Sequence, residues 1–281
     1  MELTLAAAVV SAAPAELERP PAYGVNIHTG ALVSGDLGRI HDAGFTWVRT
    51  DLTWQRVEHV AGKFDFSYFD QLANDCRAHN LRVLAILDYG NSLYASPDDA
   101  SPFLSQVNTD AFHRAYAAFS VAAVAHYAGR GFIWEQWNEP NNKHAWPPKP
   151  RSDDYIALMK EACIAIRKKF PNETIIGPAS SYIDLEFIED CLRNGMLDYW
   201  SAISVHPYRR TEPETAANDF AKLRALIARY APAGRTVPII CGEWGYSSAW
   251  KGFDDFRQAD YLTEMFQVNR KEEIPLTIWY D

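Results

Sequence analysis

The chain has 281 residues, of which 48% are hydrophobic and 22% charged, a composition that suits one folded domain with a large core and argues against disorder. Its formal net charge is −9, so the sequence offers no basic footprint for nucleic acid or for an anionic membrane surface. No apolar run is long enough to span a bilayer. We therefore expect neither a nucleic-acid partner nor a membrane span.

Residues 1–20 differ in character from the rest of the chain. The run from Leu3 to Val10 is apolar but short, and small residues follow it, as at the end of a secretory signal. The basic residues that usually open such a signal are missing, because Glu2 follows Met1. Two hypotheses remain: a signal-like segment, which would make the protein secreted or periplasmic, or an N-terminal segment that caps the bottom of the fold. Residues 21–281 would form the main domain.

The four cysteines show neither a CxxC pair nor Cys/His ligand spacing, and the chain has no glycine-rich phosphate loop. We expect buried free thiols, although a bridge between Cys163 and Cys191 is a possible alternative. The sequence thus predicts no metal site and no cofactor.

From Tyr23 onward, apolar strand-like runs alternate with amphipathic helical stretches. We predict strands at residues 23–28, 45–51, 81–88, 131–139, 174–178, 201–206, 237–243 and 276–280. We predict helices at residues 36–43, 67–79, 110–128, 152–170, 185–194, 214–230 and 255–271. Nearly continuous apolar strands between helices indicate a parallel sheet that is buried on both faces, and eight such units close a (β/α)8 TIM barrel of the α/β class. A doubly wound open sheet is the alternative.

Two of these strands end on a carboxylate. Glu139 follows an aromatic run and precedes Pro140, which cannot continue a sheet ladder, and Glu243 ends a second apolar run. Chemistry in parallel α/β folds takes place at the carboxyl ends of the strands. Two carboxyl groups at one rim are what cleavage of a glycosidic bond requires.

The motifs Trp-Asn-Glu-Pro at residues 137–140 and Gly-Glu-Trp-Gly at residues 242–245 resemble those of the clan A glycoside hydrolases. The likeness runs from about Tyr23 to the end, and family 39, in its bacterial polysaccharide-hydrolase branch, is the most similar. It implies a retaining mechanism that cleaves β-glycosidic bonds, with Glu139 as acid/base and Glu243 as nucleophile. We expect their carboxyl groups about 5–5.5 Å apart. An ionised Glu243 would raise the pKa of Glu139 and keep it protonated.

The resemblance also implies supporting residues. Asn138 can bond the sugar 2-hydroxyl, or it can simply form the turn before Pro140. Arg49 lies inside a predicted strand and needs an anion, which the clan supplies as the nucleophile. The alternative is an ion pair with Asp51 or with a buried structural carboxylate.

Four further candidates end other strands. His206 and Tyr208 follow the sixth strand, where Tyr208 would donate to Glu243 and His206 would meet a sugar hydroxyl. Trp279 matches the aromatic floor under the reacting sugar. His28, at the end of the first strand, is another sugar-binding candidate.

The sequence leaves several alternatives open. We favour an endo-acting hydrolase of a β-linked polysaccharide over a β-xylosidase-like exo enzyme or a family 5 type endoglucanase or xylanase. The chain stops directly after the last strand, whereas the family continues with a final helix. We therefore expect a missing segment or a partner to cover the barrel there. A carbohydrate-binding pseudoenzyme or inactive fragment is the alternative from another class.

Overall fold

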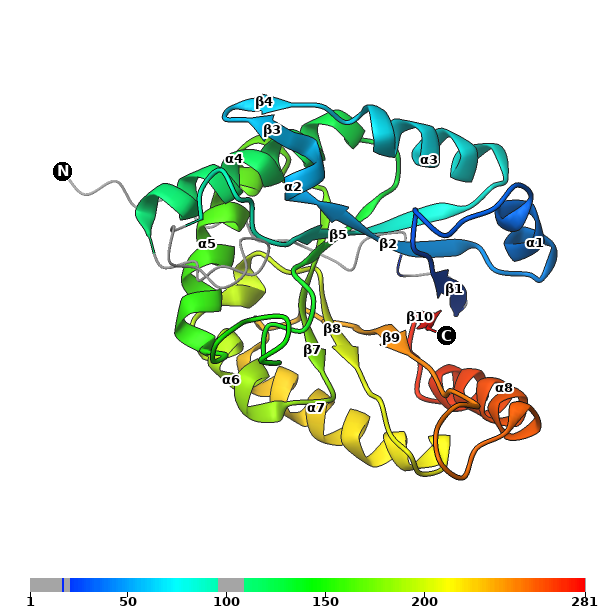
Figure 1. The fold of residues 1–281 in the computed structure, drawn as a ribbon. Coiled ribbons are helices and arrows are strands. Elements are labelled where there is room, and N and C mark those ends of the chain that lie inside the picture. The colour runs from blue at the N-terminus through cyan, green and yellow to red at the C-terminus, as the bar shows by residue number, and fades with distance from the viewer. Residues whose placement is uncertain (1–16, 18–20, 96–108, 281) are drawn as a thin grey trace.

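Eight parallel strands close into a barrel in the computed structural model, which describes residues 17, 21–95 and 109–280 (Figure 1). The strands are β1 (Ala22–Asn26), β2 (Trp47–Thr53), β5 (Arg82–Asp88), β6 (Ile133–Gln136), β7 (Thr174–Ser181), β8 (Ala202–His206), β9 (Ile239–Trp244) and β10 (Leu276–Trp279). Each strand pairs with the next, and β10 pairs in parallel with β1 to close the ring. The predicted TIM barrel is confirmed, and the open sheet is excluded.

The helices lie outside the strands, as the alternation of the sequence predicted (Figure 1). They are α1 (Asp36–Asp42), α3 (Ser67–Ala78), α4 (Asp110–Tyr127), α5 (Ser152–Lys169), α6 (Leu185–Arg193), α7 (Ala216–Tyr230) and α8 (Asp255–Lys271), with 3-10 turns η2 (Met196–Asp198) and η3 (Pro213–Thr215). Side chains of Thr109, Asp184 and Asp254 accept hydrogen bonds from backbone N–H groups in the first turns of α4, α6 and α8. These caps explain why the three helices begin where they do.

The segment after β2 was predicted as a loop, but it folds into a short helix, α2 (Trp54–Val57), and a hairpin of β3 (Glu58–Val60) and β4 (Lys63–Phe64). The buried carboxylate of Glu58 accepts hydrogen bonds from Trp54 Nε1, at 2.5 Å, and from Tyr94 hydroxyl, at 2.6 Å. Elements this short carry too little periodicity to be predicted from the sequence.

The lower half of the barrel interior is apolar. One cluster joins Leu17 to inward-facing residues of the strands: Trp47, Leu84, Ile133, Ile176, Ala202, Ile240, Leu276 and Ile278. Leu17 is the described member of residues 1–20, and it is buried against these strand residues. The apolar run from Leu3 to Val10, on which both N-terminal hypotheses depend, lies outside the described residues.

Cys76, Cys163, Cys191 and Cys241 are buried free thiols, so the expected thiols are confirmed and the possible bridge is not formed. Burial raises the pKa of the Cys163 thiol to about 12. Within the part of the chain that the structure describes, no helix is long and apolar enough to cross a membrane.

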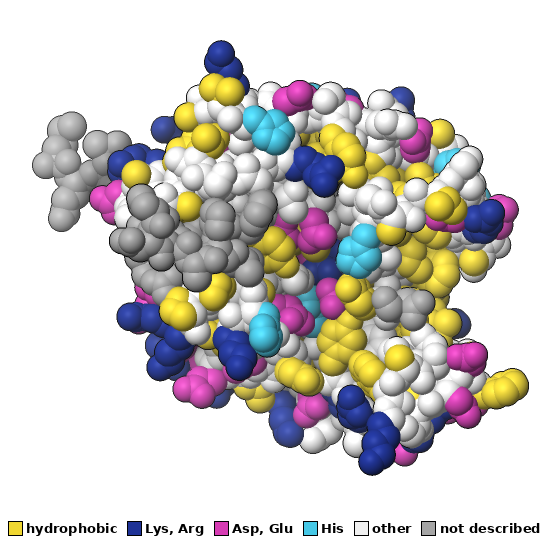
Figure 2. Space-filling view, in the orientation of Figure 1, with side chains coloured by type: hydrophobic (Ala, Val, Ile, Leu, Met, Phe, Trp, Pro, Cys, Tyr) yellow, Lys and Arg dark blue, Asp and Glu magenta, His cyan; other side chains and the backbone are white. Residues whose placement is uncertain are grey.

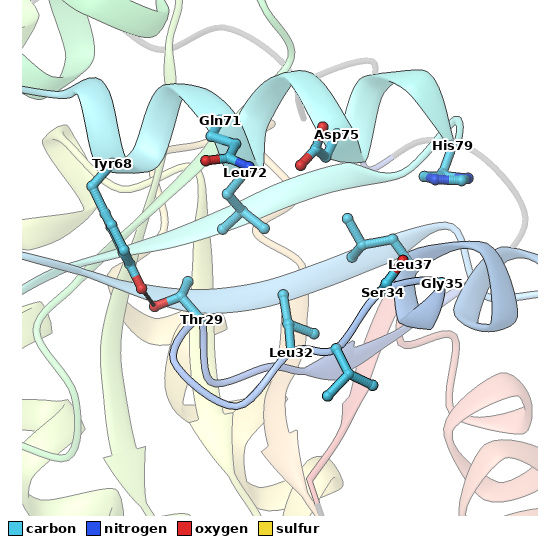
Figure 3. A pocket seen from close by; sticks show the side chains of 11 residues that line it. Thr29, Leu32, Ser34, Gly35, Leu37, Tyr68, Gln71, Leu72, Asp75 and His79 are labelled. Atoms are coloured by element: carbon cyan, nitrogen blue, oxygen red, sulfur yellow. Dashed lines mark hydrogen bonds between the residues drawn. The ribbon is translucent and has the colours of Figure 1, made fainter.

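A pocket of about 490 Å³ lies between α3 and the segment that joins β1 to α1 (Figure 3). Leu32, Leu37 and Leu72 line it, and the hydroxyl of Tyr68 donates to Thr29 Oγ1 at 2.9 Å at one end (Figure 3). Its lining includes none of the polar strand-end residues described below.

Candidate active site

The polar residues of the barrel lie above its apolar layer, at the carboxyl ends of the strands. The space-filling view shows a hollow there, in which acidic, basic and histidine side chains gather (Figure 2). Arg49 of β2 is at its centre and is only 1% exposed. Its Nε donates to Glu135 Oε2 and its Nη1 to Glu243 Oε2, both at 2.6 Å. One buried guanidinium therefore joins β2 to β6 and β9.

The remaining donors of Arg49 are also used. Nη1 bonds Asn26 Oδ1 at 3.0 Å, and Nη2 bonds Asn138 Oδ1 at 2.7 Å. Burial opposes the charge of this guanidinium, but Glu135 and then Glu243 outweigh it and raise the pKa of Arg49 above its usual value. Both sequence hypotheses for Arg49 describe the molecule, since it pairs with the expected nucleophile and with a structural carboxylate.

Glu243, near the end of β9, is held by donors at both oxygens. Arg49 occupies Oε2, and the hydroxyl of Tyr208 donates to Oε1 at 2.8 Å. Burial and the charge of Glu243 raise the pKa of Tyr208 above its usual value, so the phenol keeps its proton and remains a donor. The carboxylate is thereby fixed in one orientation at the mouth.

Tyr208→Phe removes one of these two donors, and we expect kcat/KM to fall about 10- to 100-fold, because a hydrogen bond to a charged group contributes roughly 1.5–3 kcal/mol. The melting temperature should change little, since Tyr208 is half-buried and its ring is retained. Steady-state kinetics on an aryl β-glycoside measure the effect. Unchanged kinetics would show that this phenol does not act on Glu243.

Glu139 reaches the same mouth by a turn rather than from a strand end. The predicted strand was too long, because β6 ends at Gln136. The backbone then enters the left-handed region at Trp137 (φ 66°) and again at Glu139 (φ 49°), which is uncommon for residues other than glycine. The N–H of Glu139 bonds Ala179 O of β7 at 3.0 Å, which holds the strained turn in place.

The side chain of Glu139 accepts hydrogen bonds from Asn142 Nδ2 at 3.1 Å and from His206 Nδ1 at 3.2 Å. His206 Nε2 faces the Arg49 Nη2 donor at 3.4 Å, so Nε2 is the accepting nitrogen and Nδ1 carries the hydrogen. His206 is fully buried beside the carboxylates. The sequence analysis expected it to meet a sugar hydroxyl instead.

The expected direction of the Glu139 pKa was wrong. Burial is the largest influence and favours the neutral acid, but the hydrogen bond and electrostatic influence of His206, with hydrogen bonds from Asn142 and Ser181, outweigh it and lower the pKa below its usual value. The charge of Glu243, which the sequence analysis expected to dominate, is balanced by Arg49. In the unliganded protein Glu139 is thus more acidic than an isolated glutamate.

The two carboxylates are close together. Oxygen atoms of Glu139 and Glu243 and a ring nitrogen of His206 all lie within 4.8 Å of one another. Such a trio has the composition of a metal site. However, both oxygens of Glu243 already accept hydrogen bonds, and the guanidinium of Arg49 opposes a second cation beside it. The arrangement therefore suits an uncharged substrate better than a metal ion.

Asn138, Trp279 and His28 also lie at the mouth. Asn138 is occupied on both sides, since its Oδ1 accepts from Arg49 and its Nδ2 bonds Tyr89 hydroxyl at 3.0 Å. Trp279 ends β10 beside Trp244 and is 9% exposed. His28 is exposed at the rim, where its Nε2 lies 3.4 Å from the hydroxyl of Tyr280.

Sequence reasoning missed the residues that support the predicted ones: Asn26, Tyr89, Glu135, Asn142 and Ser204. Ser204 donates to Glu135 Oε1, and a Cβ on Gly242 would come within 2.7 Å of that same oxygen. This explains the glycine before Glu243. A usable signal was present for Glu135, because a carboxylate inside an apolar strand needs a buried partner.

An eight-stranded parallel barrel with Glu139 and Glu243 at its mouth, and a buried arginine between the strands, is the architecture of the clan A glycoside hydrolases. The family model described as Cellulase (glycosyl hydrolase family 5) matches residues 24–280. The chain belongs to this family, and the resemblance to clan A is confirmed. No curated protein matches the chain.

Solved structures share the fold. A family 39 glycoside hydrolase from the gut symbiont Bacteroides cellulosilyticus WH2 is 25% identical, with a TM-score of 0.79 over 95% of this chain and 57% of that one. A family 39 β-xylosidase from Caulobacter crescentus is 19% identical, with a TM-score of 0.74 over 96% of this chain and 63% of that one. XacCel5A, solved in complex with cellopentaose, is 14% identical, with a TM-score of 0.65 over 93% of this chain and 88% of that one. The chain therefore spans less than two thirds of both family 39 chains.

Proposed function

We propose that this protein is a retaining, endo-acting glycoside hydrolase that cleaves β-linked polysaccharide. The observation that supports it most is the approach of Glu139 and Glu243 to within 4.8 Å. Retaining enzymes place their carboxyl groups about 5–5.5 Å apart, whereas inverting enzymes leave about 6.5–9.5 Å for a water molecule. One oxygen of each carboxylate lies within 4.8 Å of the other, nearer to the retaining than to the inverting separation, which favours direct attack by one carboxylate.

In the proposed mechanism, Glu243 is the nucleophile because Arg49 and Tyr208 keep it ionised and oriented. It forms a bond to the anomeric carbon while the glycosidic bond breaks, and Glu139 gives its proton to the departing oxygen. A water molecule then attacks the glycosyl–enzyme bond and returns its proton to Glu139. The product retains the configuration of the substrate, and Glu243 is released as a carboxylate.

The acid role of Glu139 predicts a pH dependence. The hydrogen bond from Asn142 stabilises the ionised form, so Asn142→Ala raises the pKa of Glu139. Because the protonated form starts the reaction, we expect the alkaline limb of the kcat/KM profile to move to higher pH in this variant. Asn194→Ala is the control, since this exposed asparagine at the end of α6 bonds Asp190 O rather than Glu139. An alkaline limb that stays in place in Asn142→Ala would assign the general acid elsewhere.

The surroundings of the two carboxylates favour a long substrate. A pocket of about 550 Å³ adjoins Tyr89, which bonds Asn138. A second pocket, of about 600 Å³, is lined by Asn142, which bonds Glu139, and by Tyr182. Two pockets, each lined by a residue that bonds Asn138 or Glu139, suit a chain of several sugars that passes through the mouth. We further propose that the protein acts outside the cytoplasm, where such a polymer is accessible.

Tyr182 is 61% exposed, and its ring is available to stack on a sugar in the second pocket. We expect Tyr182→Ala to lower turnover of cellopentaose relative to an aryl β-glucoside by roughly 3- to 10-fold, because one aromatic contact contributes about 0.5–1.5 kcal/mol. Tyr68→Ala, at an exposed tyrosine of α3, controls for loss of a surface ring. If the ratio of cellopentaose turnover to aryl β-glucoside turnover is the same in both variants, Tyr182 does not contact the substrate.

The experiment that tests the proposal is a panel of cello-, xylo- and manno-polysaccharides with the matching aryl β-glycosides. NMR of the first-formed product reports the anomeric configuration, and product sizes separate endo from exo cleavage. Release of single sugars would support a β-xylosidase-like exo enzyme. Binding without turnover would indicate the pseudoenzyme or inactive fragment, and an inverted product would contradict the retaining mechanism.

A further inference from the structure

Asp88, the last residue of β5, is a buried carboxyl group that the mechanism above does not use. It is fully buried, and neither of its oxygens accepts a hydrogen bond from a donor among residues 17, 21–95 and 109–280. A buried carboxylate without any donor is strongly disfavoured. The polar group that faces it is the side chain of Asp51.

The register of the barrel places Asp51 and Asp88 together. Neighbouring β2 and β5 pair Asp51 with Ile86 and Thr53 with Asp88, so the two aspartates are offset by two residues on adjacent strands. Asp51 follows Arg49 by two positions and therefore faces the barrel interior as Arg49 does. Asp51 is half-buried near the mouth end of β2, while Asp88, the last residue of β5, has no exposed surface.

The local charges require a proton between these two carboxyl groups. The guanidinium of Arg49 bonds Glu135 and Glu243, and its charge lowers the pKa of Asp88 by less than burial and Asp51 raise it. Burial, and after it the charge and hydrogen bond of Asp51, raise the pKa of Asp88 well above its usual value. Two carboxyl groups in contact share one proton in this way.

Two aromatic hydroxyls also lie near Asp88 but do not supply the missing donor. The hydroxyl of Tyr116 on α4 donates to Leu87 O at 2.6 Å, that of Tyr89 accepts from Asn138 Nδ2 at 3.0 Å, and neither forms a hydrogen bond with Asp88. The groups that face Asp88 are thus Arg49 and Asp51 from β2, Glu135 from β6 and these two tyrosines.

We propose that Asp51 is a substrate-binding residue. Its carboxylate accepts one hydrogen bond from the protonated Asp88 and a second from a hydroxyl group of a sugar bound at the mouth. The inference rests on the proposed glycosidase function and adds a binding residue to it. Asp51 is half-buried near the mouth, and among the residues that the structure describes its side chain has a hydrogen-bond partner only in Asp88, so the carboxylate is available to a ligand. The ligand class is a neutral sugar with free hydroxyls, because a uronate carboxylate would be repelled here.

Kinetics on cellopentaose, xylopentaose and mannopentaose test the proposal, with calorimetric binding of the same sugars. We expect Asp51→Ala to lower kcat/KM on the preferred sugar about 10- to 100-fold, mainly through KM, as for a lost hydrogen bond to a charged group. Asp88→Asn should retain most of the activity, because its amide N–H replaces the acid O–H toward Asp51. Asp88→Ala has no donor at this position, so its kcat/KM should be several-fold lower than that of Asp88→Asn.

A second readout is independent of substrate. A carboxyl group whose pKa is raised on folding binds its proton in the folded state and not in the unfolded state, so its contribution to stability falls as pH rises above about 4. We therefore expect the melting temperature of the wild type to fall relative to that of Asp88→Asn between pH 5 and 8. Parallel melting curves would show that Asp88 does not hold the proton and would overturn the proposal.

The outcomes separate this proposal from the proposed function. If the wild type turns over a pentasaccharide and Asp51→Ala matches it in KM and binding, the role of Asp51 is refuted while the glycosidase stands. If the wild type neither binds nor cleaves any sugar of the panel, both fail. Equal losses of activity in Asp88→Asn and Asp88→Ala would refute the proposal that Asp88 donates a hydrogen bond to Asp51.

Discussion

Replacing Glu243 by alanine is expected to lower turnover of an aryl β-glycoside by about 10⁴-fold or more, the size of effect seen when a catalytic nucleophile is removed. Without this carboxylate no glycosyl–enzyme bond can form, and Arg49 loses one of its two anionic partners. Steady-state kinetics measure the loss, and Glu186→Ala, at an exposed glutamate of α6, is the control.

Added azide gives this prediction a second measurement. The cavity left in Glu243→Ala can admit a small anion on the face of the sugar from which the carboxylate attacked. We expect azide to restore turnover and to yield a glycosyl azide of inverted configuration. Wild-type activity in Glu243→Ala, or rescue with retained configuration, would contradict the assignment of Glu243 as the nucleophile.

Replacing Arg49 by methionine is expected to destabilise the fold by about 3–5 kcal/mol, because removal of one partner leaves a buried charge uncompensated. Glu135 has no exposed surface and depends on Arg49 and Ser204 for its hydrogen bonds. Chemical denaturation measures the change, and activity should be lost with it because Glu243 is released. Arg49→Lys should rescue little, since an ammonium cannot reproduce the forked contacts of the guanidinium.

A double variant separates charge from packing. Glu135→Gln in the Arg49→Met background removes the uncompensated carboxylate and should recover part of the lost stability, but not the activity. If Arg49→Met unfolds at the same denaturant concentration as the wild type, the buried pair does not stabilise this barrel. If the double variant is no more stable than Arg49→Met, the loss reflects packing rather than charge.

Much of the fold was predictable because its signals are local. Apolar runs and amphipathic stretches identified all eight barrel strands, and the helix boundaries agree with the structure to within one or two residues. The largest difference is at α7, which begins at Ala216 rather than at residue 214, after the separate turn η3. The hairpin of β3 and β4 escaped prediction because two or three residues per strand carry no usable alternation.

In the candidate site, too, the residues that lie in local motifs were predictable and the contacts between distant residues were not. Glu139 and Glu243 were found because each lies in a short motif with an aromatic run before it or glycines beside it. Their contacts with Arg49, Tyr208 and His206 join residues that are 35 to 194 positions apart in the chain. The pairing of Asp51 with Asp88 depends on the register between β2 and β5, which the sequence does not specify.

The sequence by itself determined the barrel, the two motif carboxylates and the membership of clan A, because each depends on patterns that neighbouring residues carry. Only the tertiary structure decided the ionisation of Glu139. Its pKa depends on His206 from β8, Ser181 from β7 and Asn142 from the loop after β6, while the guanidinium of Arg49 pairs with Glu243. Electrostatic effects act through space over a few ångströms, so they cannot be read until barrel closure brings those groups together.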